Sequence, residues 1–352
     1  MNKFSRVLNF LRREKFYLFL LVLIIFINIA LSLFVQFLDD SGSGKISENK
    51  DFTREEIISA EKIKDAIASN SAVYFIFVFL FAIFIFFVIS GIGLDIIYLY
   101  LSRRDKTPIS RTQPIESARW GLWDICKVAI IFLFTQRIML LAEIFLFSAV
   151  PYLETKQSLR LVLSSAVMDI IAVAAVLYFV LNERRQDITA LGLTIKRFFK
   201  NVKYGIFSYI GLIPILALVM YLTTVLFRMF NIPLEPQPVL VLLQNEKHIP
   251  SLIFMSFFAA FLGPFLEEIF FRGFAYGAFK KRLGVFWGIA ISAVFFAYIH
   301  TNLASFLPIL CLGLLLAYLY EKTGSLIPSV TVHIIHNSLS LFVLLFIKVI
   351  TS

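Results

Sequence analysis

The sequence predicts an all-α, polytopic membrane protein with about nine transmembrane helices. Hydrophobic residues make up 59% of its 352 residues and the mean hydropathy is +0.86, whereas a soluble domain is about 45 to 50% apolar. Charged residues make up only 16% of the chain. Several apolar runs exceed the roughly 18 residues that indicate a spanning helix. A transmembrane β-barrel would instead show short segments of alternating hydrophobicity.

Nine apolar runs are interpreted as spans from their length and composition. They are residues 16–38, 72–101, 125–152, 158–181, 205–230, 251–279, 285–299, 305–320 and 326–349. The first run follows a basic stretch, as a cleaved signal peptide would, but it is longer than the usual core of about 7 to 15 residues. No small-x-small cleavage site follows it, so we expect an uncleaved first span.

Basic residues gather in alternate loops of this arrangement. The basic loops are residues 1–15, 102–119, 182–204 and 280–282, and the loops between them are acidic or poor in charge. The positive-inside rule then predicts a multi-pass protein of the cell membrane with a cytoplasmic N-terminus. The net charge of +10 is explained by these loops, so we expect no nucleic-acid partner.

Two regions are expected along the chain, residues 1–190 with about four spans and residues 191–352. Residues 39–71 form the one sizeable outer segment, in which Thr53 and Glu56 fit a capping box. We expect a short amphipathic helix on the outer surface there, with a solvated linker as the alternative. Cys126 and Cys311 lie in or beside apolar runs and do not suggest a disulfide framework.

Polar residues inside the third and fourth spans require an explanation, because intramembrane charges seek partners. They are Gln136, Arg137, Glu143 and Asp169. Arg137 and Glu143 are six residues apart and so do not share a helix face well. We expect structural pairing between helices, with a role in catalysis or substrate gating as the alternative.

The densest polar cluster lies in residues 261–280, where each ionisable group costs at least about 2.5 to 3.5 kcal/mol. Glu268 and Arg272 are four residues apart and can pair on one helix face. Glu267 is rotated by about 100° from Glu268 and therefore stays free to act. Pro264, one turn earlier, removes a backbone hydrogen bond and can expose a polar carbonyl near Glu267.

Three of the four histidines lie near the C-terminus, in spans that follow this cluster. His300 ends one span, and His333 shares a helix face with Asn337 in the last span. A carboxylate in a medium of low dielectric is a better general base near neutral pH, and an imidazole can help it to polarise water. A histidine and an asparagine together can donate hydrogen bonds to a developing oxyanion. This set of groups could hydrolyse an amide without a covalent intermediate.

Three motifs of these residues resemble, in order, those of the CPBP family. They are Glu267-Glu268-x-x-x-Arg272, Phe296-x-x-x-His300 and His333-x-x-x-Asn337. The family comprises the type II CAAX prenyl proteases and the bacteriocin-processing (Abi) membrane proteins. The resemblance covers residues 201–345 and implies that region 191–352 is a CPBP-like intramembrane protease domain, with catalytic helices in the C-terminal half. It implies nothing for the first four spans.

The resemblance also implies a role for each motif residue. Glu267 and His300 would activate the water, His333 and Asn337 would form the oxyanion hole, Glu268 and Arg272 would shape the site, and Phe296 would pack against it. The expected activity is endopeptidase cleavage of a membrane protein or a lipidated, for example prenylated, peptide within the lipid bilayer. His336 lies outside the pattern, and a structural role for it is as plausible as a functional one.

Besides a metal-free protease, the sequence allows a zinc-dependent protease and a non-catalytic membrane protein. Glu267, His300 and His333 could bind Zn²⁺, because three protein ligands and a water suit catalytic zinc; no cofactor is otherwise expected. The chain could instead be a non-catalytic membrane scaffold or bacteriocin-immunity protein, although the complete motif set disfavours this. A transporter is disfavoured because no internal repeat is evident.

Overall fold

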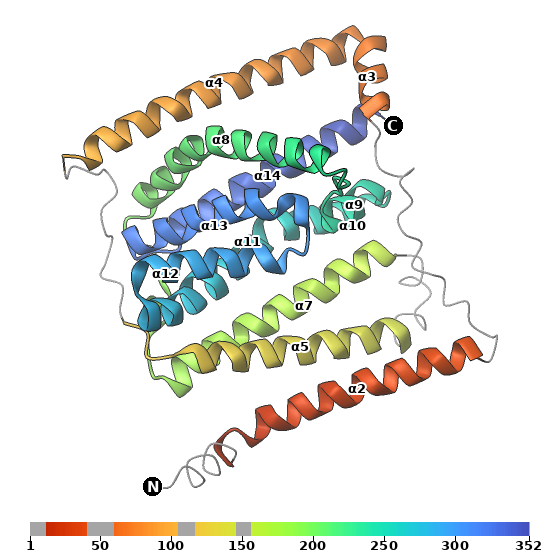
Figure 1. The fold of residues 1–352 in the computed structure, drawn as a ribbon, viewed down its shortest axis with the longest axis vertical. Helices are drawn as coiled ribbons and strands as arrows, with labels where there is room; N and C mark the ends of the chain where they lie inside the picture. Colours follow the sequence, from red (N-terminus) through yellow and green to blue (C-terminus); the bar gives the residue numbers. More distant parts are fainter. Residues whose placement is uncertain (1–11, 41–59, 105–116, 146–155, 352) are drawn as a thin grey trace. The chain divides into compact units, whose positions relative to one another are not determined.

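The computed structural model describes residues 12–40, 60–104, 117–145 and 156–351 (Figure 1). Every regular element in these residues is a helix, which confirms the all-α class. The elements are α2 (Lys15–Asp40), α3 (Ala60–Ser69), α4 (Ser71–Ser102), α5 (Leu122–Phe145), α7 (Gln157–Tyr178), η2 (Phe179–Glu183), η3 (Ile188–Leu191), α8 (Phe198–Met229), α9 (Pro238–Asn245), α10 (Ile249–Phe257), η4 (Phe258–Leu262), α11 (Gly263–Glu268), η5 (Ile269–Ala275), α12 (Tyr276–Ile299), α13 (Leu303–Thr323) and α14 (Ile327–Ile350).

Eight helical stretches in the described residues are long and apolar enough to cross a membrane, against about nine expected. The difference arises in Ile249–Ile299, one stretch of 51 residues that contains the sixth and seventh expected spans. A straight helix of that length would measure about 76 Å, whereas the hydrocarbon core is about 30 Å thick. The stretch is interrupted at Gly284, where φ is 82° and ψ is 176°, so it has two helical arms. The break follows the basic loop 280–282, where the sequence divides the two spans.

The chain forms two compact units, each containing segments that are distant in sequence. One is Met1–Ile57 with Trp123–Val176, and the other is Ile58–Leu122 with Leu177–Ser352. In terms of packing, α3 and α4 therefore belong with the C-terminal helices. The functional boundary expected near residue 190 stays a prediction.

The first unit contains α2, α5 and α7, whose charged side chains pair between elements. Glu14 is buried and lies 2.9 Å from Lys127 of α5. Glu143 of α5 accepts a hydrogen bond from Arg160 of α7 at 2.6 Å, which confirms the expected structural pairing for that residue. Arg137 Nε is buried without a hydrogen-bond partner among the described residues.

The second unit has α8 between α4 and α14, as Figure 1 shows. Glycines permit both close approaches. A Cβ on Gly91 of α4 would lie 2.3 Å from the carbonyl oxygen of Ile210, and a Cβ on Gly205 of α8 would lie 2.8 Å from that of Pro328. A buried cluster from α8, η5, α12, α13 and α14 forms the core; its largest members include Phe271, Phe296 and Leu316.

The outer segment is described only in part. Residues 60–69 form the helix α3, as expected, whereas the proposed capping residues Thr53 and Glu56 lie outside the described residues. The side chain of Asn70 then caps α4 by accepting a hydrogen bond from the amide of Ala72 at 3.0 Å. Both cysteines are free, as expected.

Candidate active site

The helix that carries the two glutamates contains two π-helical segments. In chain order between α10 and α12, the π segment η4 comes before Glu267 and Glu268, and the π segment η5 comes after them. At the end of η4 the amide of Gly263 donates to the carbonyl of Phe258, five residues earlier. Each π segment inserts extra residues per turn and rotates the side chains that follow, and such segments are frequent at functional sites. The hydrophobic pattern of the sequence gave no sign of them.

Asn337 of α14 binds a backbone carbonyl that Pro264 leaves without its usual donor. The next bond in the π ladder would run from the amide of residue 264 to Ala259, but proline has no N–H. The Asn337 side-chain amide instead donates to the Ala259 carbonyl at 2.9 Å. The Ala259 carbonyl therefore has a side-chain donor, and one of the two amide hydrogens of Asn337 is already used.

Glu268 and Arg272 form the expected ion pair, deep in the protein. The distance from Arg272 Nη1 to Glu268 Oε1 is 2.8 Å, and both side chains are completely buried. The guanidinium also lies over the ring of Phe296, 4.1 Å from its centroid, and donates to the carbonyl of Gly313 at 3.4 Å. Arg272 is therefore held by three elements and is not accessible to solvent.

His333 connects the two glutamates. Its Nδ1 lies 2.9 Å from Glu268 Oε1, and its Nε2 lies 3.8 Å from Glu267 Oε2. Glu268 Oε1 also accepts a hydrogen bond from Arg272, so it serves as the acceptor for Nδ1–H. In this tautomer Nε2 of His333 is an acceptor that faces Glu267. The Glu267 side chain is 27% exposed whereas that of Glu268 is buried. The two carboxylates therefore point to different environments, as expected from their helical rotation.

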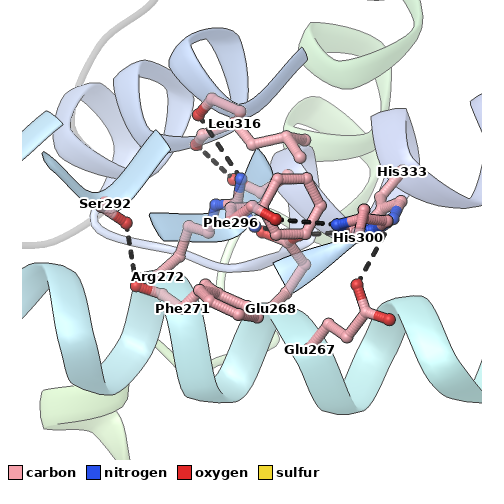
Figure 2. A network of polar contacts seen from close by, with 11 residues as sticks. Glu267, Glu268, Phe271, Arg272, Ser292, Phe296, His300, Leu316 and His333 are labelled. Carbon is pink, nitrogen blue, oxygen red and sulfur yellow. Dashed lines mark hydrogen bonds and ion pairs between the residues drawn. The ribbon is translucent and has the colours of Figure 1, made fainter. Parts of the chain in front are cut away.

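His300 lies against the same phenylalanine as His333. The ring centroid of Phe296 is 4.7 Å from that of His300 and 5.5 Å from that of His333. His300 Nδ1 donates to the Phe296 carbonyl at 2.7 Å, so its Nε2 is the acceptor nitrogen in the neutral ring. Figure 2 shows the Glu267 carboxylate below these two imidazoles.

Several polar atoms in this cluster have no hydrogen-bond partner among the described residues. They are Glu267 Oε2, Glu268 Oε2 and Arg272 Nε, and each is buried. Buried polar atoms are nearly always hydrogen-bonded, so such atoms require an explanation. The 3.8 Å gap between Glu267 and His333 is too long for a direct hydrogen bond, and both facing atoms are acceptors. A polar molecule that donates two hydrogens, such as water, fits this arrangement.

Two glycines that follow the cluster, Gly273 and Gly277, admit close neighbours, and these neighbours do not belong to a spanning helix. A Cβ on Gly273 would lie 2.9 Å from the carbonyl oxygen of Leu191 in the short 3₁₀ helix η3. A Cβ on Gly277 would lie 3.1 Å from the ring of Trp120, whose Nε1 donates to the carbonyl of Phe274 at 2.7 Å.

The element η3 is itself held by local polar contacts. Asp187 accepts a hydrogen bond from the amide of Thr189 at 2.9 Å, which caps η3 and holds the pKa of the Asp187 carboxyl below its usual value. The side chain of Gln186 donates to the carbonyl of Ser117 at 3.1 Å and accepts from the amide of Arg119 at 2.7 Å. These bonds hold the segment that precedes α8 to residues 117–119, and the neighbouring Trp120 binds the glutamate-bearing helix at Phe274.

The zinc set expected as an alternative is not assembled in the described residues. Among them, no three or more histidine, cysteine, aspartate or glutamate side chains are grouped as ligands of one metal ion. His333 binds Glu268 through Nδ1 and His300 binds a backbone carbonyl, so each ring has only Nε2 left.

The structure brings together six of the seven expected site residues. The seventh, Asn337, binds the helix that carries Glu267, at Ala259, about two turns before Glu267. The six are Glu267, Glu268, Arg272, Phe296, His300 and His333. His336 Nδ1 lies 3.3 Å from the hydroxyl of Tyr209 on α8, which indicates a structural role. Two contacts involve residues outside the expected set: the Ser292 hydroxyl donates to the Phe271 carbonyl at 3.2 Å, and the Gly313 carbonyl accepts from Arg272.

The fold and the site define a polytopic membrane protein with a buried Glu–Arg–His cluster, and the comparisons with known proteins indicate the same class. Residues 249–339 match the family of type II CAAX prenyl endopeptidases, Rce1-like. This segment contains all three motifs, so the resemblance seen in the sequence is confirmed.

Two relatives add detail. The chain is 29% identical over 112 residues to the protein named "Putative membrane peptidase YdiL" of Bacillus subtilis, covering 32% of this chain and 45% of the relative. It is 34% identical over 80 residues to the UPF0177 protein YxdF of Lactococcus lactis, covering 22% of this chain and 42% of the relative. The chain thus spans less than half the length of these curated relatives. No solved structure matches it significantly.

Proposed function

We propose that this protein is an intramembrane endopeptidase of the cell membrane that cleaves a membrane protein or a lipidated peptide, without a covalent intermediate. The observation that carries the proposal is the Glu267–His333 pair. Glu267 is the accessible carboxylate, and Nε2 of His333 faces it at 3.8 Å. The match of residues 249–339 to a membrane endopeptidase family supports the same activity.

The attacking water would be held between Glu267 and His333. Each offers an acceptor, so the water donates one hydrogen to each and directs a lone pair toward the scissile carbonyl. Glu267 takes a proton as the water oxygen bonds to the carbonyl carbon, and general base catalysis of this kind contributes about 10² to 10⁴ in rate. When the C–N bond breaks, Glu267 returns the proton to the leaving nitrogen. Glu268 and Arg272 position His333 and do not contact the substrate.

The second amide hydrogen of Asn337 is the proposed oxyanion donor, since the first already binds Ala259. His300 offers Nε2 as a second proton acceptor beside the site. The family resemblance pairs Glu267 with His300 and His333 with Asn337. The geometry favours His333 as the partner of Glu267, because it is the imidazole in ion-pair range of that carboxylate in the described part of the chain.

The matched pair Glu267→Gln and Glu268→Gln tests the proposal. We expect Glu267→Gln to purify as a stable protein that cleaves at least about 100-fold more slowly, because the base is lost but size and hydrogen bonding are kept. Glu268→Gln should lose stability as well as activity, because Arg272 would remain buried and unpaired. The measurements are cleavage of membrane peptides in proteoliposomes, with substrates first identified by proteomics of cells carrying wild type or Glu267→Gln, and thermal stability in one detergent.

Each other outcome has a defined meaning. If Glu268→Gln is stable and inactive while Glu267→Gln cleaves normally, Glu268 is the general base and Glu267 has the supporting role. Normal cleavage by both variants would refute the glutamate mechanism, whereas an absence of cleavage by wild type would favour a scaffold or immunity protein. Activity that a chelator removes and Zn²⁺ restores would favour the zinc version with Glu267, His300 and His333.

The orientation with a cytoplasmic N-terminus is proposed from the basic loops, and their packing supports it. Lys281 Nζ donates to the carbonyls of Arg119 and Trp120 at 3.1 Å each, so two basic loops lie on the same side. Reporter fusions after Lys281 should be cytoplasmic and those after Lys45 external. An external reporter at Lys281 would refute this topology.

A further inference from the structure

A cavity of about 580 Å³ lies between α4, α8 and α13 in the second unit, and the proposed catalytic groups do not line it. Its walls are mostly apolar side chains, among them Ile97, Phe207 and Leu315. Phe207 and Ile97 are each 55% exposed, so the cavity opens on the lipid-facing surface of the helices. A ligand that enters it must therefore have a hydrophobic portion.

One end of the cavity is basic. Lys200 and Lys203 line it from the first two turns of α8, and Lys200 Nζ lies 5.5 Å from the ring centroid of Tyr204. Both lysines are exposed, and neither forms an ion pair with a carboxylate in the described residues. Their charges are therefore available to an anionic group at the edge of the membrane.

Toward its other end the cavity passes the close approach of α4 to α8, and its lining continues to Ile215. Asp95 Oδ1 lies 2.8 Å from the position that a Cβ on Gly211 would take. Residue 211 is about 16 Å from residue 200 along the helix, close to half the thickness of the hydrocarbon core. The cavity thus runs from a basic rim to about the middle of the bilayer, which is the depth of one leaflet.

Polar groups lie between the two ends. The hydroxyls of Tyr98 and Tyr318 are hydrogen-bonded to each other, and Ser208 lines the cavity one turn from Tyr204. This order along the cavity is cationic, then hydroxyl-bearing, then mostly apolar, with the Asp95 carboxylate as the one acidic group among the lining residues. It matches the order of phosphate, ester carbonyls and acyl chain in a phospholipid.

We propose that this cavity binds an anionic phospholipid of the leaflet at the basic end of α8. Its phosphate would contact Lys200 and Lys203, its ester groups would lie near Ser208, and one acyl chain would lie along the apolar wall toward Gly211. The opposite face of α8 packs on α14 at Gly205, which contacts Thr331 two residues before His333. A lipid in the cavity would therefore stabilise the helix that supports the catalytic histidine.

The test measures lipid retained by the full chain. Protein is reconstituted in nanodiscs of equal parts palmitoyl-oleoyl phosphatidylglycerol and phosphatidylcholine, and bound lipids are counted by native mass spectrometry after release. We expect preferential retention of phosphatidylglycerol. Lys200→Gln with Lys203→Gln should weaken it about thirtyfold, as expected for two basic groups near an anionic headgroup.

Two further variants make the result specific. Lys196→Gln with Arg282→Gln removes the same charge from exposed positions outside the cavity and should retain phosphatidylglycerol as wild type does. Ser208→Phe fills the cavity and should lower retention of both lipids.

Three results would overturn the proposal. The first is equal retention of the two lipids by wild type, and the second is equal loss in the two double variants. The third is displacement of phosphatidylglycerol by a farnesylated peptide, which would make the cavity a site for the substrate's lipid. None of these results depends on whether the protein cleaves peptides.

Discussion

Replacing Arg272 by leucine tests whether this residue maintains the site or acts on the substrate. The guanidinium is completely buried and lies 2.8 Å from Glu268 and 4.1 Å from the ring centroid of Phe296. Leucine removes the charge and leaves the Glu268 carboxylate buried, with His333 as its remaining partner. We expect Arg272→Leu to lower the folded yield and the free energy of unfolding more than the turnover of the protein that does fold.

The magnitude follows from the burial of both partners. Breaking a buried ion pair by removing one side costs about 3 to 5 kcal/mol, because an uncompensated charge stays in the interior. The hydrogen bond between His333 and Glu268 remains, which places the expectation at the lower end, about 3 kcal/mol. Adding Glu268→Gln to Arg272→Leu removes the orphaned charge, so the double variant should be more stable than the sum of the two single losses predicts, by about 1 to 3 kcal/mol.

The assay is equilibrium unfolding of purified protein in mixed micelles, followed by helical circular dichroism, together with peptide cleavage. Arg282→Leu is the matched control, because this arginine is exposed and its replacement should change stability by at most about 0.5 kcal/mol. Wild-type unfolding of Arg272→Leu combined with complete loss of cleavage would refute the structural role and assign Arg272 to the chemistry.

Two predictions concern the backbone of the same helix. Gly284→Ala should destabilise the protein by about 1 to 3 kcal/mol, because the φ of 82° at this position disfavours any residue with a side chain. Steric overlap is not the reason, since nothing lies within 4 Å of a Cβ at residue 284. Gly93→Ala is the control: a Cβ there is equally unobstructed, φ is not positive, and the substitution should not destabilise the protein. Comparable loss in both would contradict the conformational argument. Asn337→Ala should cost about 1 to 3 kcal/mol by leaving the Ala259 carbonyl unpaired, and clearly less in a Pro264→Ala background, where residue 264 regains an amide. Equal losses in the two backgrounds, measured by the same unfolding assay, would contradict the link between the proline and the asparagine.

The parts of the site that the sequence predicted are those fixed by local helix geometry. Residues four apart on a helix lie on one face, so the Glu268–Arg272 pair followed from spacing alone. The turn of about 100° between adjacent residues likewise predicted that Glu267 would point away from Glu268. The all-α class and the position of the break after residues 280–282 followed from hydropathy and charge.

Other contacts depend on how helices pack, and spacing along the chain does not encode them. His333 and Glu268 are 65 residues apart, and Asn337 and Ala259 are 78 apart. The sequence identified Glu268, His333 and Asn337 as polar residues of interest. It did not identify their contacts, which depend on which face of α14 meets the helix that carries the glutamates. That crossing depends on the π segments, which shift the register without altering the apolar composition.

Asp95 shows the same limit outside the site. It is a lone carboxylate in a long apolar run, and its place in the sequence gave no indication of a partner. Only the approach of α4 to α8 at Gly211 places it in the wall of a cavity. The sequence by itself determined that the chain is a bundle of membrane helices and which polar side chains are candidates for the site. The tertiary structure decided which of those side chains meet, because helix packing fixes contacts between positions that local geometry leaves independent.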